Sequence, residues 1–411
     1  MDLESPHSLD VAQSKEESPP APPTETCVAP QAGLPSASVP SPGSDHGLLW
    51  IFVGAKGLRA GWSVLFFLVL GSMFSAAAFF AFFHLHLLGT EHRFTPSESI
   101  FSELAMVLGI VGAAAIVALI ERRRILDYNL RGPHSPRHFL SGLIVGFVAL
   151  SALVGALAAG GWIGFGPVAL SGAAILRSGA LWAVAFVLVG LFEEGTFRCY
   201  LQFTLTRGLN FWWALGVVAF FSIDLVLKAW INLDILAILT LGVLRTAVGG
   251  AWGVYAFAAL GFFPCLMLHR RAAPRSAFWQ AAWATSTLFG FVHTGNGGEN
   301  WVGIFAAGFI GFVFCVSIWV TGSAWWAIGC HAGWDWAETF FYGAADSGMR
   351  GQGHYLTANP AGNPLWSGGA DGPEGSLLVL GAILLLLLFL LGLYGRRNRA
   401  VPDKPSSPPA N

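Results

Sequence analysis

Residues 301–320 read WVGIFAAGFIGFVFCVSIWV, twenty consecutive residues without a charged side chain. A transmembrane helix needs about 20 mainly apolar residues, so this stretch predicts a helix that crosses a lipid bilayer. Nine other stretches have the same character. The ten predicted spans are residues 62–86, 99–120, 138–159, 180–205, 210–229, 249–268, 277–295, 301–320, 324–343 and 375–395. The expected fold is therefore all-α, a polytopic bundle of about 8–10 transmembrane helices.

The composition of the whole chain agrees with a membrane protein. Of its 411 residues, 55% are hydrophobic and 11% are charged, whereas a soluble protein has about 25% charged residues. So few charges do not cover so large an apolar mass. This excludes a soluble globular protein, a disordered protein and a nucleic-acid binder, and it makes the lipid bilayer the expected surroundings.

The first 48 residues differ from the rest. They hold seven acids against one base, and nine of the 22 prolines. Such a segment buries too little apolar surface to fold, so we expect a disordered cytoplasmic tail, and no signal peptide pattern precedes the spans. Residues 49–399 form the expected membrane domain, and residues 400–411 a second disordered tail. The stretch 230–250 is the weakest predicted part, because it is apolar but contains Asp234 and Arg245.

Basic residues predict the orientation, because Lys and Arg are enriched in cytoplasmic loops. If the spans alternate as given, most bases fall on one side, and both termini are cytoplasmic. These bases are Lys56, Arg59, Arg122, Arg123, Arg124, Arg131, Arg137, Arg207, Arg270, Arg271, Arg275, Arg396, Arg397 and Arg399. The chain is expected to be an integral multi-pass protein, of the plasma (inner) membrane if its source is prokaryotic.

Ionisable side chains inside spans are costly and mark functional sites. The fourth span contains Glu193-Glu194-Gly195-Thr196-Phe197-Arg198. Glu194 and Arg198 are i,i+4 neighbours on a helix and can neutralise each other. Glu193 points about 100° away from Glu194 and stays unpaired by that arginine. An unpaired carboxylate in a dry site suits a general base; a structural polar cluster is the other interpretation.

Two further groups lie in later spans. Phe289-Gly290-Phe291-Val292-His293 ends the seventh span, and His331-Ala332-Gly333-Trp334-Asp335 lies in the ninth. His331 and Asp335 share one helix face, where a carboxylate can fix the tautomer and orientation of an imidazole. Polar contacts that only hold helices together are the alternative. The chain contains no HExxH zinc-protease sequence and no Walker A sequence.

The three groups form the ordered set EExxxR, FxxxH and HxxxD on three separate predicted helices. This set resembles the CPBP family of CAAX-protease and bacteriocin-processing proteins, which includes the type II CAAX prenyl endopeptidases. The resemblance covers roughly residues 180–345 and implies an eight-helix core. It differs in one respect: about 95 residues separate Arg198 from His293, more than is usual. The excess matches a two-span insertion at about 210–268, which preserves the alternation of the motif helices.

The resemblance implies an intramembrane endopeptidase that acts on a membrane-embedded or lipidated peptide. Glu193 with His293 would activate a water, while His331 and Asp335 would polarise the peptide carbonyl or bind the oxyanion. Glu194 and Arg198 would set the geometry and charge. Zn²⁺ held by His293, His331 and Glu193 is one option, because two histidines and a carboxylate suit zinc; activation without a metal is the other.

Two other functions compete with a protease. A non-catalytic immunity or assembly factor could use the same scaffold, but none of the motif residues is missing. A proton-coupled transporter also uses buried acids and histidines, but it predicts repeated halves, and we find no internal repeat. The sequence leaves open the substrate, the cleavage position and the oligomeric state.

Overall fold

The computed structural model describes residues 49–54, 57–89, 94–231 and 251–395, with only the backbone for residues 49–50 and 224–231. The predicted tails 1–48 and 400–411 lie outside the described residues, as does the weak stretch 230–250 from residue 232 onward. The charged residues Asp234 and Arg245 and the side chains of Asp224 and Lys228 are likewise not described.

Long helices make up most of the described chain, which confirms the all-α prediction. They are α2 (Ala60–His84), α3 (Pro96–Ile120), α4 (Ser135–Ala159), α5 (Ala173–Glu194), α7 (Phe211–Ile231), α10 (Trp252–Arg270), α11 (Ser276–His293), α12 (Trp301–Thr321), α13 (Trp325–Asp335) and α15 (Leu377–Tyr394), and the short α6 (Gln202–Thr206) prolongs the segment of α5. Two π-helices, η2 (Gly195–Leu201) and η3 (Trp336–Tyr342), continue α5 and α13.

The remaining elements are short. They are α1 (Leu49–Phe52), β1 (Val53–Gly54), β2 (Gly57–Leu58), the 3₁₀-helix η1 (Ile125–Asp127), β3 (Ile163–Phe165), β4 (Ala345–Asp346), β5 (Met349–Arg350), β6 (Ala358–Pro360), α14 (Pro364–Ser367) and the 3₁₀-helix η4 (Pro373–Gly375). The strands pair antiparallel as β1–β2, β3–β6 and β4–β5.

Each of the ten predicted spans coincides with a helical segment. Seven helices in the described residues are long and apolar enough to cross a membrane: α2, α3, α4, the continuous segment Ala173–Thr206, α10, α12 and α15. The apolar described part of α7, Phe211–Ile223, is shorter. The helices α11 and α13 are not among the seven. α11 buries polar side chains such as Gln280 and Thr285, so its low hydropathy reflects a place inside the protein rather than in lipid.

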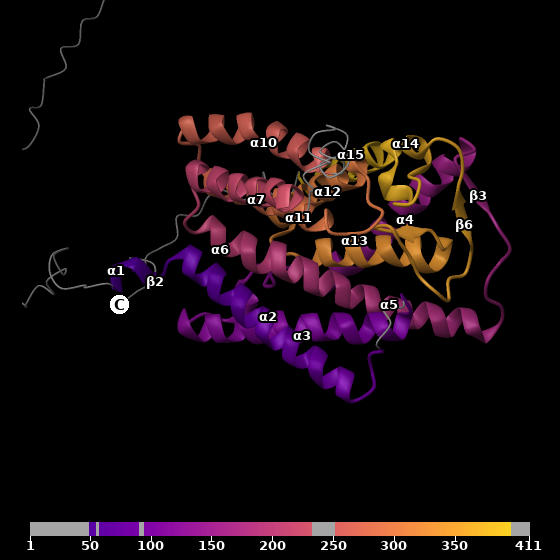
Figure 1. Ribbon diagram of the computed structural model, residues 1–411. Coiled ribbons are helices and arrows are strands. Elements are labelled where there is room, and N and C mark those ends of the chain that lie inside the picture. Colours follow the sequence, from indigo (N-terminus) through magenta and orange to yellow (C-terminus); the bar gives the residue numbers. More distant parts are fainter. Residues whose placement is uncertain (1–48, 55–56, 90–93, 232–250, 396–411) are drawn as a thin grey trace, which may run out of the picture. The chain divides into compact units, whose positions relative to one another are not determined.

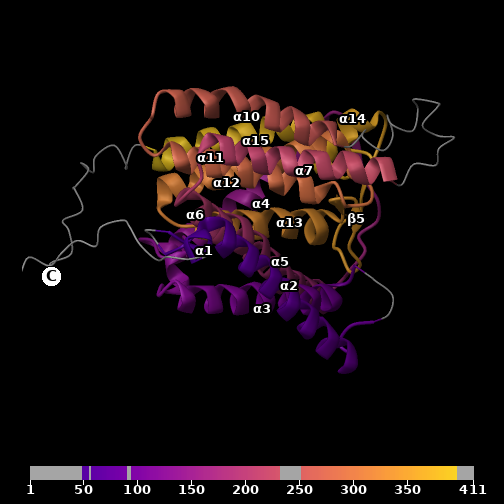
Figure 2. The same ribbon diagram turned by 60° about the vertical axis from the view of Figure 1, so that its left-hand side comes forward.

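The helices are arranged around α12 and α13. Figures 1 and 2 show α2 and α3 at one side of the bundle and α10 at the other, with α13 between them. In α12, 72% of the most apolar stretch is buried inside the protein, whereas the corresponding share in the other six spans is 17–33%. Of the seven apolar helices, α12 therefore lies deepest inside the protein.

Glycines bring α4 and α13 into close contact. Two GxxxG sequences, Gly142–Gly146 and Gly329–Gly333, face the partner helix, and a Cβ on any of the four would collide with a backbone carbonyl oxygen of that helix. Small residues at this spacing let transmembrane helices approach closely. His331 lies between the two glycines of the second GxxxG. The packing of α13 on α4 therefore fixes the position of its imidazole along the bundle.

Replacing Gly333 with Ala is expected to destabilise the protein by about 1–3 kcal/mol, because the new methyl group overpacks the interface. The atom in its way is the backbone oxygen of Leu143, which no side-chain rotation moves aside. Thermal unfolding of the detergent-solubilised protein measures the effect. Gly381→Ala in α15 is the control, because nothing lies within 4 Å of its added Cβ. Equal melting temperatures for the two variants would contradict the interpretation.

The loops at one end of the bundle are joined to one another. The β3–β6 pair connects the segment after α4 to the segment after η3. Asn300, which caps α12, donates its backbone N–H to Asp371 Oδ2 at 3.1 Å and its side-chain amide to Gly375 O at 3.0 Å. Gln352 N–H donates to Phe94 O at 2.8 Å. This end therefore has an ordered cover made of four loops.

Candidate functional site

The first and third motifs lie where an α-helix changes into a π-helix. α5 ends at Glu194 and η2 begins at Gly195, while α13 ends at Asp335 and η3 begins at Trp336. π-helical turns are rare and occur frequently at functional sites. Both helices thus change geometry directly after the carboxylates that the sequence singles out.

Glu194 and Arg198 form the predicted i,i+4 ion pair. Arg198 Nε lies 3.2 Å from Glu194 Oε2, and neither side chain is exposed. The guanidinium also lies over the ring of Phe289, 4.1 Å from its centroid, which is a cation–π contact. Gly311 makes room for it, because a Cβ there would collide with Arg198 Nη2. Phe289 of the second motif therefore packs against Arg198 of the first motif.

His331 lies among three carboxylates. Its Nδ1 donates a hydrogen bond to Glu194 Oε1 at 3.0 Å, while Nε2 lies 3.7 Å from Glu193 Oε2 and 3.4 Å from Asp335 Oδ2. Because Glu194 also pairs with Arg198, its carboxylate fixes both the imidazole and the guanidinium. Glu193 has no ion pair with Arg198 in the described part of the chain, as predicted, and its side chain keeps 26% exposure.

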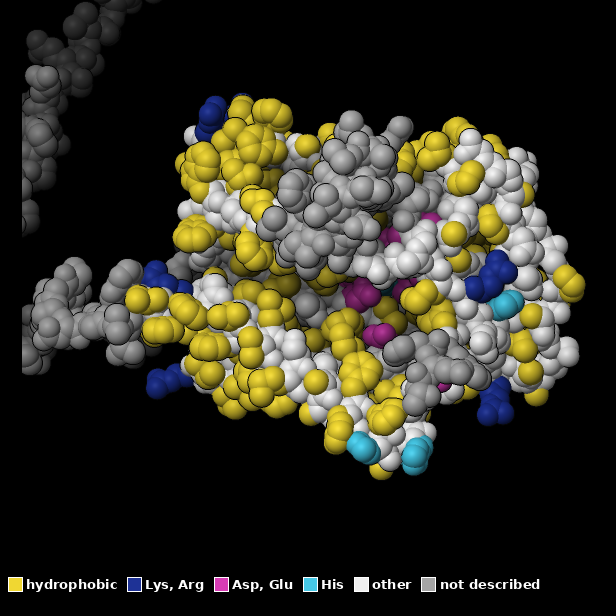
Figure 3. Space-filling model, in the orientation of Figure 1, with side chains coloured by type: hydrophobic (Ala, Val, Ile, Leu, Met, Phe, Trp, Pro, Cys, Tyr) yellow, Lys and Arg dark blue, Asp and Glu magenta, His cyan; other side chains and the backbone are white. Residues whose placement is uncertain are grey.

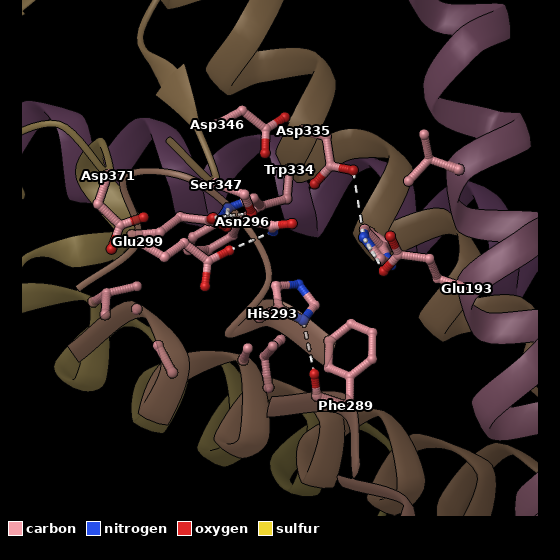
Figure 4. Close-up of a pocket in the computed structure, with 18 of the residues that line it drawn as sticks. Glu193, Phe289, His293, Asn296, Glu299, Trp334, Asp335, Asp346, Ser347 and Asp371 are labelled. Carbon is pink, nitrogen blue, oxygen red and sulfur yellow. Dashed lines mark hydrogen bonds and ion pairs between the residues drawn. The ribbon is translucent and has the colours of Figure 1, made fainter. Parts of the chain in front are cut away.

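His293 makes no polar contact with Glu193, the residue with which the resemblance pairs it. Its Nδ1 lies 2.7 Å from the carbonyl oxygen of Phe289, one turn earlier in α11. Within the described ranges no hydrogen bond or ion pair joins His293 to Glu193. The nearest imidazole partner of Glu193 is His331, although His293 and Glu193 both reach the same cavity (Figure 4).

One cavity of about 230 Å³ holds most of the predicted site residues. Its walls include Glu193, His293, His331 and Asp335, whereas Glu194 and Arg198 are buried behind it. Seven acids line it: Glu103, Glu193, Glu299, Asp335, Asp346, Asp371 and Glu374. No Lys or Arg of the described chain is among the lining residues. The three motifs thus meet at one acidic cavity.

Five of these acids are absent from the set predicted from sequence. Glu103 lies within the second predicted span and was detectable there as an intramembrane acid. Glu299, Asp346, Asp371 and Glu374 lie in loops, where acids are common and carry no signal by themselves. Only the folding of the loops over the cavity brings them to the site.

A compact set of carboxylates lies at the loop side of the cavity. Oxygens of Glu338, Asp346 and Glu374 lie within 4.8 Å of one another, a spacing that suits a hard divalent cation. Trp334 Nε1 donates to Glu338 Oε2 at 3.1 Å and to Glu374 Oε1 at 2.8 Å. Among described residues no comparable set joins His293, His331 and Glu193, the predicted zinc ligands.

The loop acids titrate unusually. Burial, reinforced by the charges of Glu299 and Asp346, raises the pKa of Asp371 to about 8, against the hydrogen bond from Asn300. Burial raises the pKa of Asp346 to about 6. The pKa of such a carboxyl is higher in the folded protein than in the unfolded chain. The folded protein therefore loses stability as the pH rises from the pKa of the unfolded chain to the pKa of the folded protein.

We therefore expect the protein to become less stable between about pH 4 and pH 8, with Asp371 contributing up to about 1.4 kcal/mol per pH unit. Asp371→Asn is expected to flatten this dependence, because the amide keeps an acceptor for Asn300 and does not ionise. Melting temperatures at pH 5 and pH 8 give the measurement, with Asp127→Asn in η1 as the control. A wild-type protein equally stable at both pH values would refute the expectation.

The family comparison agrees with the motifs. Residues 262–337, under a fifth of the chain, match the model of the type II CAAX prenyl endopeptidase Rce1-like family. The segment contains the second and third motifs, and the first lies outside it. No curated protein and no solved structure matches the chain. The segment from α10 to η3 is thus similar to the Rce1-like type II CAAX prenyl endopeptidases, the family that the three motifs predict.

Proposed function

We propose that this protein is an intramembrane endopeptidase that hydrolyses a peptide bond of a membrane-associated or lipid-anchored protein. The observation that carries the proposal is the convergence of Glu193, His331 and Asp335, from α5 and α13, at one cavity that His293 also lines. The Rce1-like segment supports a protease over the other functions that such a scaffold performs.

Glu193 acts as the general base. Its Oε2 has no hydrogen bond among the described residues and lies 3.7 Å from His331 Nε2. A water beside this carboxylate gives its proton to Glu193 while its oxygen attacks the carbonyl carbon. The C–N bond then breaks, and the same proton passes to the leaving nitrogen, as general acid–base catalysis requires.

His331 stabilises the oxyanion. Its Nδ1–H is held by Glu194, so the Nε2 side is the one presented to the cavity. As an imidazolium, it donates from Nε2 to the developing oxyanion, and this donor is pre-oriented before substrate binds. An ionised Asp335 would repel the oxyanion, so its role is to orient His331 from 3.4 Å.

His293 acts from another wall of the cavity. With Nδ1–H directed at Phe289 O, its Nε2 is left to accept a hydrogen bond from the N–H of the scissile peptide bond and so orient it. Zinc binding by His293, His331 and Glu193 remains a proposal from the sequence. These three side chains do not form a compact ligand set among the described residues, so the proposed mechanism uses Glu193 and the two histidines without a metal.

Comparison of membrane peptide termini tests the proposal. Mass spectrometry of N- and C-terminal peptides is done on membranes of cells with the wild-type chain, with Glu193→Ala, with His293→Ala and without the gene. Glu98→Gln is a matched control, because Glu98 lies on α3 but does not line the cavity. We expect termini that are present with the wild type and Glu98→Gln and absent from the others. Identical termini in all strains, with both alanine variants still rescuing a deletion phenotype, would overturn the proposal in favour of a non-catalytic role.

A further inference from the structure

The two ends of the helix bundle differ in charge. Arg207 binds Glu121 bidentately, at 2.6 and 3.0 Å, and Arg123 lies 3.2 Å from the same carboxylate, so the ends of α3 and α6 lie together. Following the alternating helices, the basic residues of the described loops fall at this base-rich end. They are Arg59, Arg122, Arg123, Arg124, Arg131, Arg137, Arg207, Arg270, Arg271 and Arg275. The opposite end carries Arg177 and Arg350, and Lys228, whose side chain is not described, lies in the last turn of α7 there.

The cavity belongs to the opposite end. The lining residues outside the α-helices come from the connecting segments there: Phe94, Asn296, Glu299, Asp346, Ser347, Met349, Asp371 and Glu374. None of the described residues in the loops at the base-rich end lines it. His293, at the last position of α11, also faces this end, since α11 begins next to Arg275.

A layer of buried polar residues closes the cavity toward the base-rich end. It consists of Arg198, Gln202, Thr285 and Cys315, which lie nearer that end than the motif carboxylates on α5 and His293 on α11. All four have 0% exposure. Thr285 Oγ1 donates to Gln202 Oε1 at 3.1 Å, and Cys315 Sγ lies 3.8 Å from the same oxygen. This buried layer, called the floor below, separates the cavity from the base-rich end within the described residues.

The side of the bundle is more open. Figure 3 shows acidic side chains in a hollow of a face that is otherwise rich in apolar side chains. Among the described side chains, α2 exposes Leu, Phe and Val and α7 exposes Trp, Phe and Ile, as helices in lipid do. A segment that leaves the bilayer can therefore reach the carboxylates from the lipid side.

Basic loops are retained on the cytoplasmic side of membrane proteins. We propose that the site faces away from the cytoplasm, so that its substrate is the extracytoplasmic juxtamembrane segment of a membrane-anchored or exported protein. This rests on the proposed protease function and names its substrate class. A lipid-anchored tail in the cytoplasm would lie on the wrong side of the floor.

Cysteine labelling tests the orientation without any need for activity. Ala361 and Ala272 are exposed alanines at the opposite and the base-rich end, and each is replaced by Cys in a Cys27→Ser chain. The four described cysteines are buried. In sealed vesicles whose cytoplasmic face is inside, a membrane-impermeant maleimide is expected to label Ala361→Cys at once and Ala272→Cys only after permeabilisation. The reverse pattern overturns the proposal and leaves the protease function intact.

The position of the cleaved bonds in the substrate proteins is the second test of this proposal. Termini that depend on Glu193 are expected in segments on the extracytoplasmic side, within reach of the membrane. Termini on the cytoplasmic side would overturn this inference alone. Correct labelling with no Glu193-dependent termini would overturn the protease function, and with it the substrate class.

Discussion

Glu193→Gln is expected to lower kcat for peptide cleavage by about 10²–10⁴-fold, the usual contribution of a general base. Gln keeps the size of the side chain but does not accept the proton of the attacking water. The side chain is 26% exposed and forms no ion pair with Arg198 in the described chain, so the fold should survive the change. The rate is measured on the purified protein in liposomes, with the peptide that the comparison of membrane termini identifies.

Two controls separate chemistry from folding. Glu98→Gln removes an acid from α3 outside the cavity and should cleave at the wild-type rate. The melting temperature of Glu193→Gln should stay within a few degrees of the wild type. A Glu193→Gln protein that is folded and fully active would remove Glu193 from the mechanism.

Arg198→Met is expected to destabilise the protein by about 3–5 kcal/mol, because it leaves a buried carboxylate without its partner. Both side chains of the pair have 0% exposure, and the guanidinium packs 4.1 Å from the centroid of Phe289. Thermal unfolding in detergent measures the loss. Arg271→Met, at an exposed position of the α10–α11 turn, should leave stability unchanged.

A double variant shows whether charge or packing causes this loss. Glu194→Gln with Arg198→Met removes both charges, so it should recover much of the stability that Arg198→Met loses. If the double variant is as unstable as the single one, packing of the guanidinium against Phe289 would be the main contribution instead.

Local rules predict much of the fold and part of the site. Each predicted span coincides with a helical segment, because long apolar runs leave a chain in lipid no alternative to helix. The pairs Glu194–Arg198 and His331–Asp335 follow from i,i+4 spacing alone. Contacts between residues on different helices depend on how the helices pack, which local spacing does not predict. Glu193 lies closest to His331, whereas the motif roles pair it with His293.

Other features lie beyond sequence rules. No sequence pattern predicts the changes from α-helix to π-helix at Gly195 and Trp336. These changes alter which residues share a face of the helix. The carboxylate of Glu338, which follows Asp335 within η3, lies with those of the loop residues Asp346 and Glu374. Loop acids such as Asp371 reach the cavity through contacts distant in sequence, such as that with Asn300.

The central claim is that Glu193 and His331 act on one water and one carbonyl as a unit. Cleavage rates of the wild type, Glu193→Gln, His331→Asn and the double variant test it most directly, since groups that act together are non-additive. We expect the double variant to be about as slow as the slower single variant. Losses that multiply in the double variant, or a double variant that still cleaves at the wild-type rate, would contradict the claim.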